Sequence, residues 1–394
     1  MKITGLETLH ADAGWRNFSF LKLLTDQPGL VGWSEFNEGG GNRGLEAAIK
    51  GLVPFITGED PFAHERLHAR LFALTRQVSG GIAGQAIAAI ENAALDIKGK
   101  ALGVPVHQLF GGPVRERLRL YWSHCGNYRL GAQHKLIGKP PIQSLDDVAA
   151  AGREARERGF TALKTNPFRF EGGKARIDMP GFAKGAGWPE LNWDRPLLEA
   201  LAAQMTAFRD GAGPGVDLML DLNFNFKTEG YLQVARRLEP IGMSWLEIDS
   251  RDPAALAHIR RESRIPIASC ESLYGSRSYR PYFEHQSVDV AIVDITWNGL
   301  AQSLKVATMA DAFEINVAPH NFFGPICTLM SAHFCAATPN FRLMELDVDD
   351  VPWRDELVTA PPVIKEGHLQ VPMAPGWGAE VDEVAVRRHP PKVP

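Results

Sequence analysis

Several features that mark particular protein classes are missing from this sequence of 394 residues. No apolar run approaches the roughly 20 residues of a membrane-spanning helix, which argues against a membrane protein. The N-terminal segment has no apolar core of the kind found in signal peptides, so we do not expect secretion. A formal net charge of −4 offers no basic surface for nucleic acid or anionic lipid, and we expect neither partner.

Cysteine is also scarce, and its spacing is uninformative for metals. The chain has four cysteines, at 125, 270, 327 and 335, and none of them forms a CxxC pair. Hydrophobic residues make up 45% and charged residues 22% of the chain, which is typical of a soluble globular protein. We therefore expect reduced thiols in a cytoplasmic enzyme.

The length suits two domains. Alternating apolar and polar residues near the N-terminus predict antiparallel strands, and apolar spacing of three and four then predicts helices. We assign residues 1–115 to a first α+β domain. A Gly-rich stretch at about 33–44 is either a simple hairpin connection or a mobile lid over a substrate, with Glu35 and Asn37 as candidate contacts.

Acidic residues and one histidine recur at a nearly constant interval in the second half of the chain. They follow short apolar runs and stand 26, 24, 23, 26 and 25 residues apart, about one strand plus one helix: Asp221, Glu247, Glu271, Asp294, His320 and Glu345. This spacing predicts a TIM-like (β/α) barrel over residues 116–350, whose site lies at the C-terminal ends of its strands. An insertion at 166–195 is either a surface loop or part of a substrate enclosure.

The residue types along this ladder predict the chemistry. Asp221, Glu247 and Glu271 would repel one another at one rim unless a cation held them, and hard oxygen ligands suit Mg²⁺. An Asp one strand before a His can fix its tautomer and raise its basicity, so we expect His320 to be a base oriented by Asp294.

A helix in the first domain carries a family resemblance. The run AAIENAALDIKGK at 88–100, followed by LGVP at 102–105 and LFGG at 109–112, resembles the mandelate racemase/muconate lactonising branch of the enolase superfamily. The terminal pattern of Gly376, Gly378, Glu380 and Asp382 is similar to that family's last segment. The resemblance implies an N-terminal capping domain, a modified (β/α)7β barrel and a segment at 351–394 that returns to the capping domain. It also implies a homo-oligomer.

The resemblance is strongest to the mandelate racemase subgroup, and it implies roles for individual residues. Asp221, Glu247 and Glu271 would bind Mg²⁺, and His320 with Asp294 would form the dyad. Lys164 would pair with the carboxylate of a small-molecule substrate, and Glu345 would hydrogen-bond it, as a donor only if its pKa is raised. Further candidate substrate contacts are Asn166, Asn223, Ser123, His124, Glu35 and Trp297.

Two departures from the subgroup bear on the reaction. The family pattern K-x-K has Asn166 at its second position, so the second base that a racemase needs is missing. Galactonate dehydratase-like members share K-x-N but have a His as general acid at the position of Asn223. The residue that acts as general acid in this protein is therefore not identified by the resemblance, and protonated His320 is one option. We expect dehydration of an acid sugar, an aldonate or aldarate. Alternatives are a cycloisomerase of a sugar-acid lactone or anhydro sugar acid, a racemase or epimerase and, last, a non-catalytic binding relative.

Overall fold

The first elements of the chain form an antiparallel sheet packed on helices. The computed structural model describes residues 1–39, 43–182 and 190–392, so parts of the 33–44 loop and of the 166–195 insertion lie outside the described residues. The sheet has the order β1-β2-β3. Its strands and the helices that follow are β1 Ile3–Asp12, β2 Asn17–Thr25, β3 Val31–Phe36, α1 Leu45–Gly51, α2 Val53–Ile56, α3 His64–Thr75 and α4 Gly81–Leu102.

The Ala-rich helix α4 packs closely against β3, as its small residues predict. A Cβ atom at Gly32 would stand 2.0 Å from the Ala93 carbonyl oxygen, so only glycine fits at this contact. The Trp33 amide donates to Asp96, and Gly103 ends the helix in the left-handed conformation, with φ of 70°.

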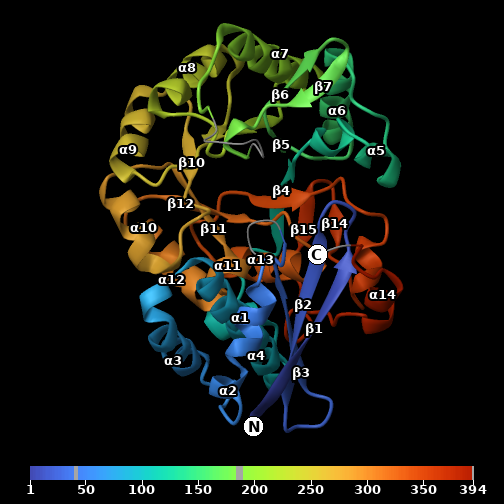
Figure 1. Ribbon diagram of the computed structural model, residues 1–394, viewed down its shortest axis with the longest axis vertical. Helices are drawn as coiled ribbons and strands as arrows, with labels where there is room; N and C mark the ends of the chain where they lie inside the picture. Colours follow the sequence, from blue (N-terminus) through green and yellow to red (C-terminus); the bar gives the residue numbers. More distant parts are fainter. Residues whose placement is uncertain (40–42, 183–189, 393–394) are drawn as a thin grey trace.

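A barrel occupies the middle of the chain (Figure 1). Eight strands of the described chain form a ring of parallel pairs, and hydrogen bonds between Val317 and residues 340 and 342 join its seventh strand to the segment before the eighth. The ring strands are β4 Arg117–Ser123, β5 Ala162–Thr165, β8 Asp217–Asp221, β9 Trp245–Glu247, β10 Ile267–Ser269, β11 Val290–Asp294, β12 Asn316–His320 and β13 Met344–Asp347.

Helices surround the ring in Figure 1 and connect its strands. They are α5 Gln133–Leu136, α6 Leu145–Glu157, α7 Arg195–Ala212, α8 Thr228–Leu238, α9 Pro253–Glu262, α10 Gly275–Glu284, α11 Ile295–Asn298, α12 Leu300–Asp311 and α13 Pro325–Ala337. The TIM-like barrel with an N-terminal α+β domain is thus confirmed. The described insertion residues include a hairpin of β6 Phe168–Glu171 and β7 Lys174–Ile177.

The C-terminal residues contact both parts of the molecule. β14 Ile364–Lys365 and β15 His368–Gln370 pair with each other, and β15 also pairs with the start of β4. Trp377 donates through its indole to the Trp33 carbonyl, and α14 Glu383–Arg388 lies beside β1. The exact domain boundaries near 115 and 350 stay a prediction.

Two further observations concern the cysteines and the helices of the described residues. The four cysteines are buried and form no disulfide. Within the described ranges, no helix is both long enough and apolar enough to cross a membrane.

Candidate active site

The barrel core determines which side chains reach the rim. Its inner layer contains one or two buried apolar residues from each strand or its start: Tyr121, Ala162, Met219, Trp245, Ala268, Val290, Ile292, Ala318 and Leu343. Side chains two positions apart in a strand point the same way, so the residue two places further on stands above this layer. In seven of the eight strands that residue is polar and was singled out from the sequence: Ser123, Lys164, Asp221, Glu247, Asp294, His320 and Glu345.

Glu271 reaches the rim by a different route. β10 ends at Ser269, and the residue above Ala268 is Cys270, which has a positive φ of 93°. The strand therefore ends two residues before Glu271, so Glu271 is not a strand-end residue like the other members of the series. Glu271 lines the cavity, and its carboxylate lies 3.7 Å from His320 Nε2.

Lys164 lies among the rim carboxylates. Its Nζ is 2.9 Å from Glu247, 3.1 Å from Glu345 and 3.5 Å from Asp221, and its side chain is buried. Burial alone would lower the pKa of this amine, but the three carboxylates raise it well above its usual value. An ammonium at this position offsets part of the repulsion among the acids.

The same lysine has opposite consequences for two of its partners. Burial raises the pKa of Glu247 to about 8; Lys164 opposes this shift, and Asp221 and Glu271 add to it. Burial would also raise the pKa of Glu345, but Lys164 and His320 lower it to about 2. Glu345 therefore accepts hydrogen bonds, from the Ser123 hydroxyl and the Asn321 amide. This differs from the raised pKa that a donor role requires.

The acidic cluster fits Mg²⁺ by its donor set. Among the described residues no group of three His, Cys, Asp or Glu side chains stands ready to hold a metal ion. The carboxylate oxygens of Asp221, Glu247 and Glu271 are nevertheless hard oxygen donors of the kind that Mg²⁺ prefers, and Glu247 Oε1 is buried without a hydrogen-bond partner in the described chain. An unsatisfied oxygen in an all-oxygen set suits Mg²⁺ better than a metal that prefers thiolate or imidazole.

His320 and Asp294 form the expected pair across adjacent strands. His320 Nδ1 lies 2.5 Å from Asp294 Oδ2, and the Trp297 amide donates to the other oxygen of Asp294. In the metal-free protein burial lowers the pKa of His320, but the charges of Glu271 and Asp294 outweigh burial and raise it to about 10, so the imidazole becomes a free base near neutral pH only when a cation offsets the charge of Glu271. The Trp297 ring lies 5.2 Å from the imidazole, between centroids, and lines the cavity. The imidazole is thus oriented with Nε2 available to the cavity.

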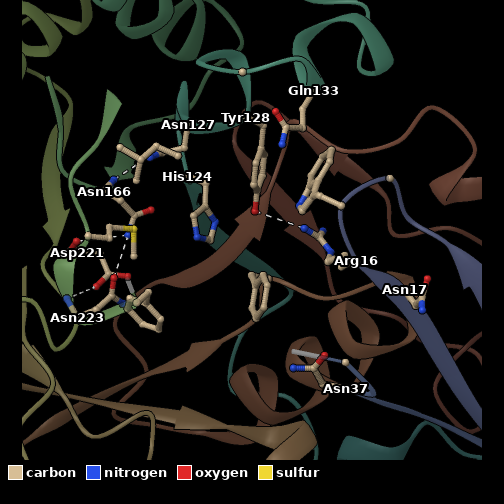
Figure 2. Close-up of a pocket in the computed structure, with 18 of the residues that line it drawn as sticks. Arg16, Asn17, Asn37, His124, Asn127, Tyr128, Gln133, Asn166, Asp221 and Asn223 are labelled. Atoms are coloured by element: carbon tan, nitrogen blue, oxygen red, sulfur yellow. Dashed lines mark hydrogen bonds between the residues drawn. The ribbon is translucent and has the colours of Figure 1, made fainter. Parts of the chain in front are cut away.

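Residue 166, which follows β5 three strands away from β12 around the ring, supplies an amide. Asn166 Nδ2 lies 3.4 Å from both the Asp221 carbonyl oxygen and Asn223 Oδ1, and the backbone N–H of Asn166 donates to Asn127 Oδ1. Figure 2 shows Asn166, Asp221 and Asn223 close together on one side of the cavity. At neutral pH none of these amide side chains can act as a base.

The cavity extends well beyond the rim of the barrel. It has a volume of about 1280 Å³ and is lined also by the β1–β2 hairpin, by Asn37 and, from the insertion, by Ala175, Ile177, Met179 and Phe182. Glu35 does not line it: this buried carboxylate accepts hydrogen bonds from Gly324 and Cys327 at the start of α13. His124 does line it, whereas Ser123 is buried and is not one of the lining residues.

Four residues of this region escaped the sequence analysis. Asp249 is buried near the acidic cluster, and neither of its oxygens has a hydrogen-bond partner among the described residues. Asp347 contacts His124, Tyr128 and Arg16. Asp249 and Asp347 follow Glu247 and Glu345 by two residues. Since side chains two positions apart in a strand point the same way, this spacing could have indicated that both acids lie near the rim. Nothing in the sequence pointed to Tyr128 or Arg16.

Comparisons with known families agree with this geometry. Residues 11–111 match the mandelate racemase / muconate lactonizing enzyme N-terminal domain, and residues 147–385 match the enolase C-terminal domain-like family. A Burkholderia xenovorans strain LB400 protein, provisionally named an L-alanine-DL-glutamate epimerase and crystallised with magnesium and fumarate, superposes with a TM-score of 0.96. It is 49% identical, over 100% of this chain and 97% of that one.

Curated relatives with other names also align along the chain. D-xylonate dehydratase of Haloferax volcanii is 29% identical over 98% of this chain and 89% of its own length. D-galactonate dehydratase of Ralstonia nicotianae is 28% identical over 98% of this chain and 94% of its own length. With both domains matched, the chain is an enzyme of the mandelate racemase/muconate lactonizing branch of the enolase superfamily.

Proposed function

We propose that this enzyme dehydrates an acid sugar, an aldonate or aldarate, to a 2-keto-3-deoxy acid. The observation that carries the proposal is the asymmetry of the cavity. His320, oriented by Asp294, is the base at the end of β12, and residue 166, which follows β5 three strands away around the ring, is an amide. A racemase needs a base on both faces of the α-carbon, whereas an elimination needs only one.

Residues of the rim would bind the substrate carboxylate and the metal. Asp221, Glu247 and Glu271 would hold Mg²⁺, which when bound supplies positive charge where the enediolate develops. The Lys164 ammonium would pair with the substrate carboxylate, and its contacts with Glu247 and Glu345 fix it at the base of the cavity. The low pKa of Glu345 suits it to accept hydrogen bonds from the substrate.

The proposed reaction begins at the α-carbon. Nε2 of His320 takes the α-proton, and the electron pair of the C–H bond moves into the enediolate. This pair then forms the α,β double bond as the β-hydroxyl leaves with one proton as water. The enol that results tautomerises to a 2-keto acid, so substrate equals product plus water.

The lining of the cavity suits a polyhydroxylated substrate. Amide side chains, which both donate and accept hydrogen bonds, recur around it: Asn17, Asn37, Asn127, Gln133, Asn166 and Asn223. The relatives named as D-xylonate and D-galactonate dehydratases support the same substrate class.

Other reactions of an enediolate have weaker support. A cycloisomerase of an anhydro sugar acid or a sugar-acid lactone also needs one base and is the second candidate. Epimerisation, which the name of the 49% identical Burkholderia protein suggests, ranks lower because residue 166 here is asparagine.

The test is a screen of an acid-sugar library with Mg²⁺, in which 2-keto acids are trapped with semicarbazide. We expect keto-acid product from at least one aldonate or aldarate. Isomeric product of unchanged mass would replace the proposal by cycloisomerisation or epimerisation, and no turnover of any acid would replace it by binding.

The base is tested separately with His320→Asn. This variant should lose α-proton exchange in D₂O by about 10²- to 10⁴-fold while Mg²⁺ binding, measured by calorimetry, is kept. His258→Asn, at an exposed position on α9, is the matched control. Exchange near the wild-type rate in His320→Asn would remove His320 as the base.

A further inference from the structure

A second histidine at the rim is paired with a buried carboxylate. His124 follows β4, and its Nδ1 lies 2.7 Å from Oδ1 of Asp347, which ends the neighbouring strand β13. The pair has the same construction as His320 and Asp294: a strand-end imidazole bound through Nδ1 to a buried Asp on the next strand. The two pairs involve different strands, so their imidazoles approach the cavity from different parts of the rim.

The backbone and its neighbours fix the direction of the His124 ring. Residue 124 has a φ of 49°, in the left-handed region that few non-glycine residues adopt, and the next amide donates to the Lys164 carbonyl. The ring packs against Tyr128 and Phe322, with centroids 5.3 and 5.9 Å away. Figure 2 shows it projecting into the cavity, and because Nδ1 faces Asp347, Nε2 is the nitrogen left for a ligand.

Asp347 is held in place by two other groups. The Tyr128 hydroxyl donates to Oδ2 over 2.8 Å, and the Arg16 guanidinium lies 3.2 Å from the same oxygen. Arg16 comes from the β1–β2 hairpin of the first domain and also pairs with Asp350 at 2.9 Å. Since these groups occupy Oδ2, Oδ1 is directed at His124. A carboxylate fixed in this way orients an imidazole and fixes its tautomer.

The proposed dehydration needs a proton donor, because hydroxide is a poor leaving group. Asn166 and Asn223 are amides and cannot serve. Among the described cavity-lining residues, Lys164 is held by three carboxylates and is assigned to the substrate carboxylate. The Tyr128 hydroxyl donates its proton to Asp347. Only two imidazoles line the described cavity, and His320 is assigned to the α-proton.

We propose that His124 is the general acid of this enzyme and that Asp347 positions it; the inference rests on the proposed dehydration. As the enediolate pair forms the double bond and the β-carbon–oxygen bond breaks, protonated His124 transfers its Nε2 proton to the departing oxygen. Water leaves and His124 becomes neutral. Before the next turnover His320 releases the α-proton to solvent, and solvent returns a proton to His124.

The test separates proton removal from departure of the hydroxyl. The enzyme is loaded with Mg²⁺ and assayed on the acid sugar that the wild type dehydrates fastest. His124→Asn should lower the dehydration rate by about 10²-fold or more, while α-proton exchange in D₂O stays within about threefold of wild type. His134→Asn, nearby in α5 but outside the cavity lining, should match wild type in both assays.

A substrate with a better leaving group gives a second readout. On the 3-fluoro-3-deoxy analogue, fluoride departs with less need of a proton, so His124→Asn should lose less than about tenfold. Asp347→Asn should show the same selective loss in smaller degree. A purely structural role would lower exchange, dehydration and fluoride release together, and that result would overturn the proposal.

Other outcomes are equally decisive. Dehydration by His124→Asn near the wild-type rate would overturn the assignment of the acid and leave the proposed function standing. If His124→Asn fails to fold by circular dichroism, the Asp347→Asn ratios decide in its place. A wild type that yields no keto acid would refute the dehydration itself, which is distinguishable from failure of the acid.

Discussion

Replacement of Glu247 by glutamine should stabilise the metal-free protein and remove its response to Mg²⁺. The pKa of Glu247 is about 8 in the folded protein and 4.5 for an ordinary glutamate. Because the pKa is higher in the folded protein, ionisation of Glu247 lowers the free energy of unfolding. This loss is absent below about pH 4.5, where the carboxyl is protonated in both states, and it grows until about pH 8. At pH 7 this loss is about 3 kcal/mol, and glutamine avoids it. Lys164 keeps Asp221 and Glu345 as partners in the variant.

Magnesium should reverse the ranking. A hundredfold excess of Mg²⁺ over its dissociation constant adds about 2.7 kcal/mol to the wild type, and much less to a variant that has lost one ligand. The assay is urea unfolding at pH 7 in EDTA and in Mg²⁺, with the exposed Glu262→Gln as control. A variant less stable than wild type in EDTA would refute the electrostatic reasoning. Equal stabilisation of variant and wild type by Mg²⁺ would refute the ligand role.

Three further predictions concern pH, the opposite face of the cavity and the start of α13. Burial lowers the pKa of His333 to about 3, so between pH 7 and 5 this histidine takes up a proton in the unfolded chain but not in the folded one. The free energy of unfolding of the wild type should therefore fall by about 2 kcal/mol over this range, and that of His333→Gln should not. Urea unfolding at both pH values checks this. Asn166→Lys should add a base opposite His320 and yield epimerised substrate by NMR in D₂O; dehydration without any epimer would contradict this. Glu35→Ala should cost about 1–3 kcal/mol in unfolding free energy with KM unchanged, and a raised KM at full stability would instead make Glu35 a substrate contact.

The barrel was predictable because its repeat is local. Each unit of about 25 residues contains one buried strand and one amphipathic helix, and strand alternation then decides which residue faces the rim. The strand-end residues Asp221, Glu247, Asp294, His320 and Glu345 were therefore expected at one rim of the barrel, where the structure places them. The same reasoning misjudged the end of β10, since the turn at Cys270 depends on a positive φ that the sequence does not signal.

Interactions between distant segments were not predictable. Arg16 and Asp350 are 334 residues apart in the chain, and only the folded hairpin brings that guanidinium to the rim. The pKa of Glu345 depends on Lys164 and His320, which lie on other strands. Alternation along one strand predicts which way a side chain points. It does not predict which charged side chain from another strand will lie opposite, and that partner determines the pKa.

The position of Glu35 links the two halves of the chain in a way that matters for protein engineering. This β3 carboxylate satisfies backbone amides at the start of α13, immediately after the strand that bears His320. Exchange of the first domain between relatives, to transfer substrate preference, would remove the cap of a barrel helix unless the donor domain carries an equivalent acid. Chimeras in this family should therefore be matched at this contact before their specificity is compared.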